Sequence, residues 1–180
     1  MIFGRLILIG IISVLFASCT GTSNGDRDFD YYTMANAQKM AESNDKKIIV
    51  DVYTDWCTFC KQLENEVYPD DRIGQVVNEY FYVVRINAES DEMLVYNGKK
   101  ISMRDFAELL GVSTYPSTVF IDKSGTTIGQ QSGYMEVEVF EKLLAFVGSS
   151  AYRTMQFDEF SVNSLPFRSG GRNQAQQAGN

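Results

Sequence analysis

The chain has 180 residues, of which 44% are hydrophobic, and it carries a formal net charge of −7. This length allows one domain with its own core, and an acidic balance without a basic run argues against nucleic-acid binding. The chain contains no histidine, and the absence of this common general base and metal ligand disfavours triad hydrolases and histidine-containing metal enzymes.

The N-terminus is typical of an exported protein. Arg5 is the single charge ahead of an apolar stretch over residues 6–16, which is too short to span a bilayer as a stable helix. Residues 1–18 therefore resemble a signal peptide, and Cys19 after two small residues resembles the lipidated cysteine of bacterial lipoproteins. The alternative is an ordinary cysteine near a general signal-peptidase site. Lipidation of Cys19 would leave an even pair of cysteines, and we expect residues 19–30 to be a flexible tether.

Hydrophobic periodicity predicts one domain of helices and strands over residues 31–150. Apolar residues recur at helical spacing in five segments: residues 33–44, 57–68, 70–80, 103–110 and 136–147. Composition typical of strands marks four segments: residues 47–53, 81–87, 117–122 and 126–131. Helices separate the first two strands, which indicates a parallel β-α-β unit, whereas a short turn joins the last two, which indicates an antiparallel hairpin.

Two segments of the chain are less regular. Asn97-Gly98 within residues 88–102 could close a small hairpin or punctuate a long loop, and we treat this stretch as an insertion. Residues 151–180 form a C-terminal extension that we expect to be largely disordered after residue 168, where Gly, Gln and Asn dominate. Four apolar side chains of the extension could dock on the domain: Phe157, Phe160, Leu165 and Phe167.

Cys57 and Cys60 lie where the predicted strand over residues 47–53 passes into a helix. A cysteine at a helix N-terminus meets unpaired N–H groups and the positive end of the helix dipole, which favour a thiolate. Cys60 lies one turn along and can attack a mixed disulfide made by Cys57. Zinc would need four ligands, but Cys19 is the only other cysteine. A purely structural disulfide would close too small a loop to restrict the unfolded chain much. We therefore expect a redox pair, with no metal and no cofactor.

The order of these elements and several motifs resemble the thioredoxin family over about residues 45–148. Residues 56–61, Trp-Cys-Thr-Phe-Cys-Lys, resemble its active-site run. Four further residues match the family in the correct order: Asp51, Arg85, Pro116 and Gly133. The resemblance implies an α/β fold, a three-layer sandwich in which helices flank a central mixed sheet. The chain looks more similar to the periplasmic subgroup related to the C-terminal domain of the membrane thiol-reductant transporter.

The resemblance also implies roles for individual side chains. Asp51 would be a buried carboxylate that accepts the proton of Cys60, although outward strand alternation would make it a surface acid. Pro116 would be cis and would present the backbone of Tyr115 to an extended substrate, although from sequence alone it could precede a strand as a trans residue. Trp56 would shield the site and contact substrate, and it could equally be a partly buried core residue.

These features predict a membrane-tethered thiol-disulfide oxidoreductase that reduces protein disulfides. Its expected partners are protein thiols and disulfides, an inner-membrane thiol donor, and the membrane through the lipid at Cys19, with no nucleic acid. The expected location is the bacterial cell envelope, with the domain facing the periplasm. Thr58-Phe59 stands where cytosolic thioredoxin has Gly-Pro, so the redox potential has to be argued separately. The alternatives are a non-catalytic binding or assembly module and a disulfide oxidase or isomerase.

Overall fold

A four-stranded sheet lies at the centre of residues 30–166, the part of the chain that the computed structural model describes. The strand order is β2-β1-β5-β6. The strands are β1 (Lys47–Tyr53), β2 (Phe81–Asn87), β5 (Ser117–Ile121) and β6 (Thr127–Ser132). β1 and β2 are parallel, whereas β5 is antiparallel to both β1 and β6. The predicted β-α-β unit, the hairpin and the mixed sheet are therefore confirmed.

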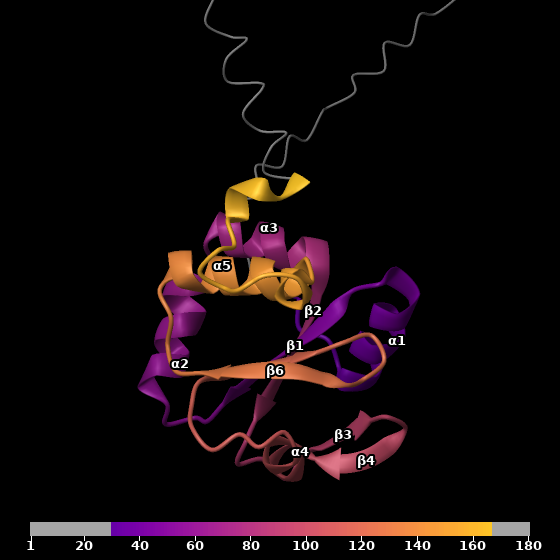
Figure 1. The fold of residues 1–180 in the computed structure, drawn as a ribbon. Coiled ribbons are helices and arrows are strands. Elements are labelled where there is room, and N and C mark those ends of the chain that lie inside the picture. Colours follow the sequence, from indigo (N-terminus) through magenta and orange to yellow (C-terminus); the bar gives the residue numbers. More distant parts are fainter. Residues whose placement is uncertain (1–29, 167–180) are drawn as a thin grey trace, which may run out of the picture.

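Helices cover both faces of the sheet and complete the three layers of the expected α/β fold (Figure 1). One layer holds α1 (Met34–Asn44), α4 (Met103–Leu109) and a small hairpin of β3 (Met93–Tyr96) and β4 (Lys99–Ser102). The other holds α2 (Thr58–Gln62), the π-helical turn η1 (Leu63–Val67), α3 (Asp71–Tyr80) and α5 (Val137–Gly148). None of the helices within residues 30–166 is long and apolar enough to cross a membrane.

Three helices begin at residues whose side chains cap the first turn. Thr33 accepts a hydrogen bond from an amide of α1, Asp70 from an amide of α3, and Ser102 from an amide of α4. Such caps satisfy N–H groups that have no partner inside the helix. Periodicity and caps together explain why the helix starts predicted from the sequence lie within one residue of the observed ones.

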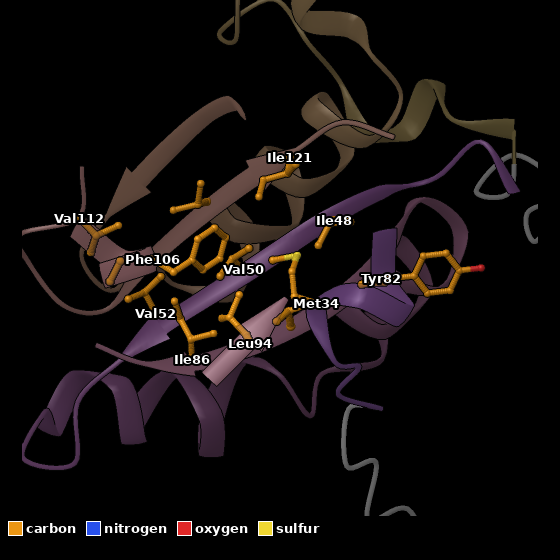
Figure 2. Packing of buried hydrophobic residues seen from close by; sticks show 14 of the residues in the cluster. Met34, Ile48, Val50, Val52, Tyr82, Ile86, Leu94, Phe106, Val112 and Ile121 are labelled. Atoms are coloured by element: carbon orange, nitrogen blue, oxygen red, sulfur yellow. The ribbon is translucent and has the colours of Figure 1, made fainter. Parts of the chain in front are cut away.

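The strand β1 is covered by helices on both faces of the sheet, so its side chains are buried on both sides. Figure 2 shows the core on the α1 and α4 side, which includes Met34, Ile48, Val50, Val52, Phe106 and Ile121. Successive side chains of a strand alternate between faces, so Ile49 and Asp51 point to the opposite layer, where Ile49 packs among residues of α3 and α5. No position in the centre of β1 faces solvent, and the interpretation of Asp51 as a surface acid is therefore wrong.

The stretch predicted as one helix over residues 57–68 changes its winding midway. After Gln62 the chain forms the π-helical η1, in which the amide of Tyr68 donates to the carbonyl of Leu63 at 3.0 Å. Leu63, Val67 and Tyr68 are all buried. The wider turn brings these three side chains into the core within six residues. Single π-turns of this kind are frequent at functional sites.

Residues 88–102 form a hairpin, which decides between the two interpretations of Asn97-Gly98. Both residues have positive φ, 49° and 74°, as a tight two-residue hairpin turn requires. The hairpin packs on the domain through Leu94, which is buried in the core on the α1 and α4 side, and through Tyr96, whose ring centroid lies 4.7 Å from that of Phe106 on α4. The insertion therefore has an apolar anchor of its own.

The two ends of the described chain also lie against the domain. At the start, Tyr31 forms a bridge with Val83 of β2. After α5, the chain continues through two short 3-10 turns, η2 (Ala151–Arg153) and η3 (Val162–Ser164), and Phe160 and Leu165 are buried against the α3 and α5 layer. The expectations for the signal peptide, for Cys19, for most of the tether, for Phe167 and for the tail after residue 168 concern residues outside those described.

Candidate redox site

Cys57 and Cys60 form a disulfide at the point where β1 gives way to α2. Cys57 is the N-cap residue of α2, and its sulfur accepts a hydrogen bond from the backbone amide of Cys60 at 3.0 Å. The amide of Cys57 in turn donates to the carbonyl of Thr54, which fixes the loop before the helix. After reduction of the disulfide, the same N–H group and the helix dipole would stabilise a thiolate at Cys57.

The two cysteines do not differ in exposure in the disulfide form. Each is 4% exposed. Both sulfurs are tied into one bond at the base of the loop, and this bond shields them equally. The difference that the structure shows between the two sulfurs is the hydrogen bond that Cys57 accepts from the amide of Cys60.

Asp51 lies in the interior layer that also contains α2, with 3% of its surface exposed. Burial raises its pKa from 3.8 to about 6, and the positive charge of Arg85 and a hydrogen bond from Tyr68 oppose this rise. Arg85 is its partner in the β1–β2 register, and the Arg85 Nε atom lies 3.4 Å from the Asp51 Oδ2 atom. A carboxylate with a pKa near 6 is suited to accept a proton at neutral pH and to release it again.

Arg85 is held on several sides, which keeps its charge beside Asp51. Its guanidinium group forms a bidentate ion pair with Glu64, with 2.8 Å between Nη2 and Oε2. The guanidinium carbon lies 4.3 Å from the ring centroid of Tyr53 and 5.6 Å from that of Tyr31. The hydrogen bond from Arg85 lowers the pKa of Glu64. The site therefore contains one arginine between two carboxylates, and the pKa is raised for Asp51 and lowered for Glu64.

A cavity of about 240 Å³ lies beside the Arg85–Glu64 ion pair and Cys60. Its lining residues come from the end of β1, from α2 and η1, and from β2: Tyr53, Thr54, Asp55, Cys60, Lys61, Glu64 and Arg85. The Thr54 hydroxyl is buried and has no hydrogen-bond partner within residues 30–166. Cys60 and the Arg85–Glu64 ion pair therefore line the same cavity.

The loop before β5 supplies the second wall of the site. The Tyr115-Pro116 peptide bond is cis, which replaces the trans alternative considered from the sequence. The carbonyl of Pro116 accepts a hydrogen bond from the amide of Gly133 at 2.8 Å. This bond places the loop after β6, including Tyr134, beside the loop that carries Tyr115.

Two pairs of aromatic side chains adjoin the cysteines. Trp56 and Phe59, the neighbours of the two cysteines, are 65% and 59% exposed, so Trp56 is not a core residue. The ring centroid of Trp56 lies 5.9 Å from that of Tyr115 in an edge-on contact, and Phe59 lies 6.3 Å from Tyr134. The indole nitrogen of Trp56 donates to Glu89 at 2.9 Å.

Three of these residues were missed from the sequence: Glu64, Glu89 and Tyr134. Glu64 follows Cys60 by four residues on one helix, a spacing that could have indicated a shared face. Glu89 lies in the inserted stretch, and Tyr134 lies in the loop after β6. No local pattern marks either of them, because their contacts with Trp56 and Phe59 join segments far apart in the chain.

Comparisons with known proteins agree with this geometry. A family model described as a thioredoxin-like domain matches residues 34–148. The thiol:disulfide interchange protein DsbD of Actinobacillus pleuropneumoniae serotype 5b is 29% identical over 110 residues, which are 57% of this chain and 16% of that protein. The chain thus matches only a small part of the length of this curated relative.

Solved structures show the same fold. A thioredoxin-fold protein from Helicobacter pylori has a TM-score of 0.57 at 24% identity, covering 64% of this chain and 77% of its own. A thioredoxin from Thermus thermophilus has a TM-score of 0.56 at 18% identity, covering 74% and 98%. The family model spans more than half of the chain and includes Cys57 and Cys60. With this match and a disulfide between those two cysteines, the chain belongs to the family of thioredoxin-like domains.

Proposed function

We propose that the protein is a membrane-tethered thiol-disulfide oxidoreductase that reduces disulfides in other proteins. The observation that carries the proposal is Cys57 at the N-cap of α2, with the amide of Cys60 directed at its sulfur. Asp51 supports the proposal as a buried carboxylate of raised pKa whose partner, Arg85, lines the same cavity as Cys60. A sulfur in this position is the nucleophile that disulfide exchange requires. The similarity to DsbD, a thiol:disulfide interchange protein by name, supports the same class of reaction.

The reaction begins with the reduced pair. The thiolate of Cys57 attacks one sulfur of the substrate disulfide, the substrate S–S bond breaks, and the other substrate sulfur leaves as a thiolate that takes a proton from water. Cys60 then transfers its proton to the carboxylate of Asp51 and attacks the sulfur of Cys57. The mixed disulfide breaks, the Cys57–Cys60 disulfide forms, and the second substrate sulfur leaves as a thiolate. This thiolate takes a proton from water, and Asp51 returns the proton of Cys60 to water. Two electrons have passed from the cysteine pair to the substrate.

The pair must then be reduced by a thiol donor, and we propose a dithiol protein of the inner membrane. Anchoring through a lipid on Cys19 would keep the domain in the cell envelope, facing the periplasm. The reducing direction is supported by Thr58 and Phe59, which place no positive charge between the cysteines. Strong oxidants of this type depend on an unusually stable thiolate. A non-catalytic module would have no need of the amide on Cys57 or of the buried Asp51.

Trapping of the covalent intermediate tests the proposal. The full-length protein should accelerate the reduction of insulin by dithiothreitol. Cys60→Ser should accumulate a mixed disulfide with a protein substrate, because Cys57 can attack and nothing resolves the product. The matched Cys57→Ser variant should accumulate none. A wild-type protein that does not accelerate insulin reduction, together with equal trapping by the two variants, would contradict the proposed reaction.

A further inference from the structure

An aromatic rim adjoins the disulfide and consists of the exposed Trp56 and Phe59 and the half-buried Tyr115 and Tyr134. Trp56 and Phe59 are two of the three most exposed large hydrophobic side chains in the described part of the chain. Large apolar side chains that lie together on a solvent-exposed face of a protein indicate a contact surface. Here they adjoin the reacting sulfurs, because Trp56 directly precedes Cys57 and Phe59 directly precedes Cys60.

The rim has two walls. Trp56 and Tyr115 form one, and Phe59 and Tyr134 form the other. The hydrogen bond from the amide of Gly133 to the carbonyl of Pro116 joins the loops that carry the two tyrosines. A substrate chain that reaches Cys57 therefore meets aromatic side chains beside both cysteines.

One aromatic side chain of each wall contacts a glutamate carboxylate. The indole of Trp56 donates to Glu89, and the hydroxyl of Tyr134 lies 3.5 Å from the Glu136 Oε2 atom. Partial burial and the negative charges of Glu136 and Glu66 raise the pKa of the Tyr134 hydroxyl. The carboxylates of Glu66, Glu89 and Glu136 form no salt bridge with a lysine or arginine within residues 30–166.

The positive charges close to the site are few. Arg85 is already paired with Asp51 and Glu64, and Lys61 lines the cavity that also contains Cys60. Arg104 donates to the backbone carbonyl of Glu89 at 2.7 Å and forms its ion pair with Asp91. Aromatic faces beside carboxylates are the surroundings that lysine and arginine side chains prefer, through cation-π contacts and ion pairs. The rim is therefore apolar at its centre and negative at its edge.

We propose that this rim selects extended protein segments in which the reacting cysteine lies beside an apolar residue and a basic residue. The inference rests on the proposed function and adds a substrate class to it. The apolar side chain packs on Phe59 and Tyr134, and the basic side chain pairs with Glu66 and Glu136. Acidic disulfides, including oxidised glutathione, are repelled by the same carboxylates.

Three peptides with one internal disulfide and equal length test this selection, together with hydroxyethyl disulfide as a small neutral substrate. The first peptide places leucine and arginine beside the cysteine, the second replaces arginine by glutamate, and the third replaces both residues by serine. We expect kcat/KM to fall about fivefold or more from the arginine peptide to the glutamate peptide, mainly through KM. The ratio should shrink at high salt, because the carboxylates are exposed and are screened.

Variants of the rim residues test whether the rim causes the preference among the peptides. Glu66→Gln with Glu136→Gln should reduce the ratio between the arginine and glutamate peptides to near one. Tyr134→Ala should raise KM for the leucine peptides relative to the serine peptide. Glu138→Gln is the matched control, because the carboxylate of Glu138 is already paired with Arg72; its peptide preferences should equal those of the wild-type protein.

The outcomes separate this inference from the proposed function. If no disulfide is reduced, hydroxyethyl disulfide included, the proposed function itself fails. If hydroxyethyl disulfide is reduced but the three peptides have equal kcat/KM, the redox function stands and the rim does not select substrates. A preference for the arginine peptide that survives the double glutamine variant would also overturn the inference, because the preference would then come from elsewhere.

Discussion

Asp51 should destabilise the folded protein at neutral pH, and replacing it by asparagine should remove the penalty. The side chain is buried, and its pKa rises from 3.8 to about 6 on folding. Between these two values the native protein holds the Asp51 proton more tightly than the unfolded chain does. Stability therefore falls as the pH rises through this window, and the loss is complete above pH 6.

The size of the loss follows from the difference between the two pKa values. A separation between 3.8 and about 6 corresponds to about 3 kcal/mol of unfolding free energy. Asparagine has nearly the shape of a protonated aspartate and never ionises. Asp51→Asn should therefore stabilise the oxidised protein by up to about 3 kcal/mol near pH 7.5, and by close to nothing near pH 3.5, where both states are protonated.

Urea unfolding of the oxidised full-length protein at the two pH values measures this effect, with circular dichroism as the signal. Asp91→Asn is the matched control, because Asp91 is exposed in its ion pair with Arg104 and its replacement should change stability little at either pH. An Asp51→Asn variant that is equally stabilised at both pH values, or destabilised near pH 7.5, would refute the assignment of a raised pKa. The same variant should resolve mixed disulfides more slowly, since Cys60 loses its proton acceptor.

Three further predictions concern the cysteines. In the reduced protein, iodoacetamide should label Cys57 much faster than Cys60 at about pH 7, because the amide of Cys60 stabilises only the Cys57 thiolate; equal rates would remove Cys57 as the nucleophile. Cys19→Ala should release the protein from membranes or block its processing, whereas a correctly cleaved variant that still sediments with membranes would exclude a lipid anchor. Equilibration with glutathione buffers should give a potential more reducing than about −200 mV, because Thr58 and Phe59 add no positive charge; a midpoint above about −150 mV would indicate an oxidase.

The sequence predicted the order of helices and strands because each element carries its own pattern. The apolar run of β1 and the spacing of α5 depend on neighbours a few residues away, and the caps at Thr33 and Asp70 are local as well. The π-helical turn at Leu63 was not predictable in the same way. It depends on how three side chains reach a core made of distant elements.

The site was predictable only where residues adjoin the cysteines. Trp56 and Phe59 are neighbours of Cys57 and Cys60 in the chain, so their place beside the disulfide follows from the sequence. Their degree of exposure does not, because it depends on Tyr115 and Tyr134, which arrive from other loops. The hairpin of residues 93–102 could likewise be predicted only in part from the sequence. Its turn has a sequence signature, but its docking through Leu94 on α1 and β2 depends on tertiary contacts.

The C-terminal extension provides a last test, because it lies beyond the segment that matches the family model. Phe160 is buried, and its ring centroid lies 5.5 Å from that of Phe146 on α5. Loss of a buried phenylalanine costs about 3–5 kcal/mol through lost burial and the cavity that remains. Phe160→Ala should therefore lower the unfolding free energy of the full-length protein by about 3 kcal/mol, because the surrounding segment is short and can relax in part.

Phe157→Ala is the matched control for this prediction. Phe157 also contacts Phe146, but it is far more exposed than Phe160, so its loss should cost clearly less. The extension packs on the α3 and α5 layer, whereas the disulfide lies where β1 meets α2 (Figure 1). Both variants, assayed well below their unfolding temperatures, should reduce insulin at the wild-type rate. Equal stability losses in the two variants would mean that the extension adds no buried anchor to the fold, and a loss of activity without a loss of stability would link it to the redox site instead.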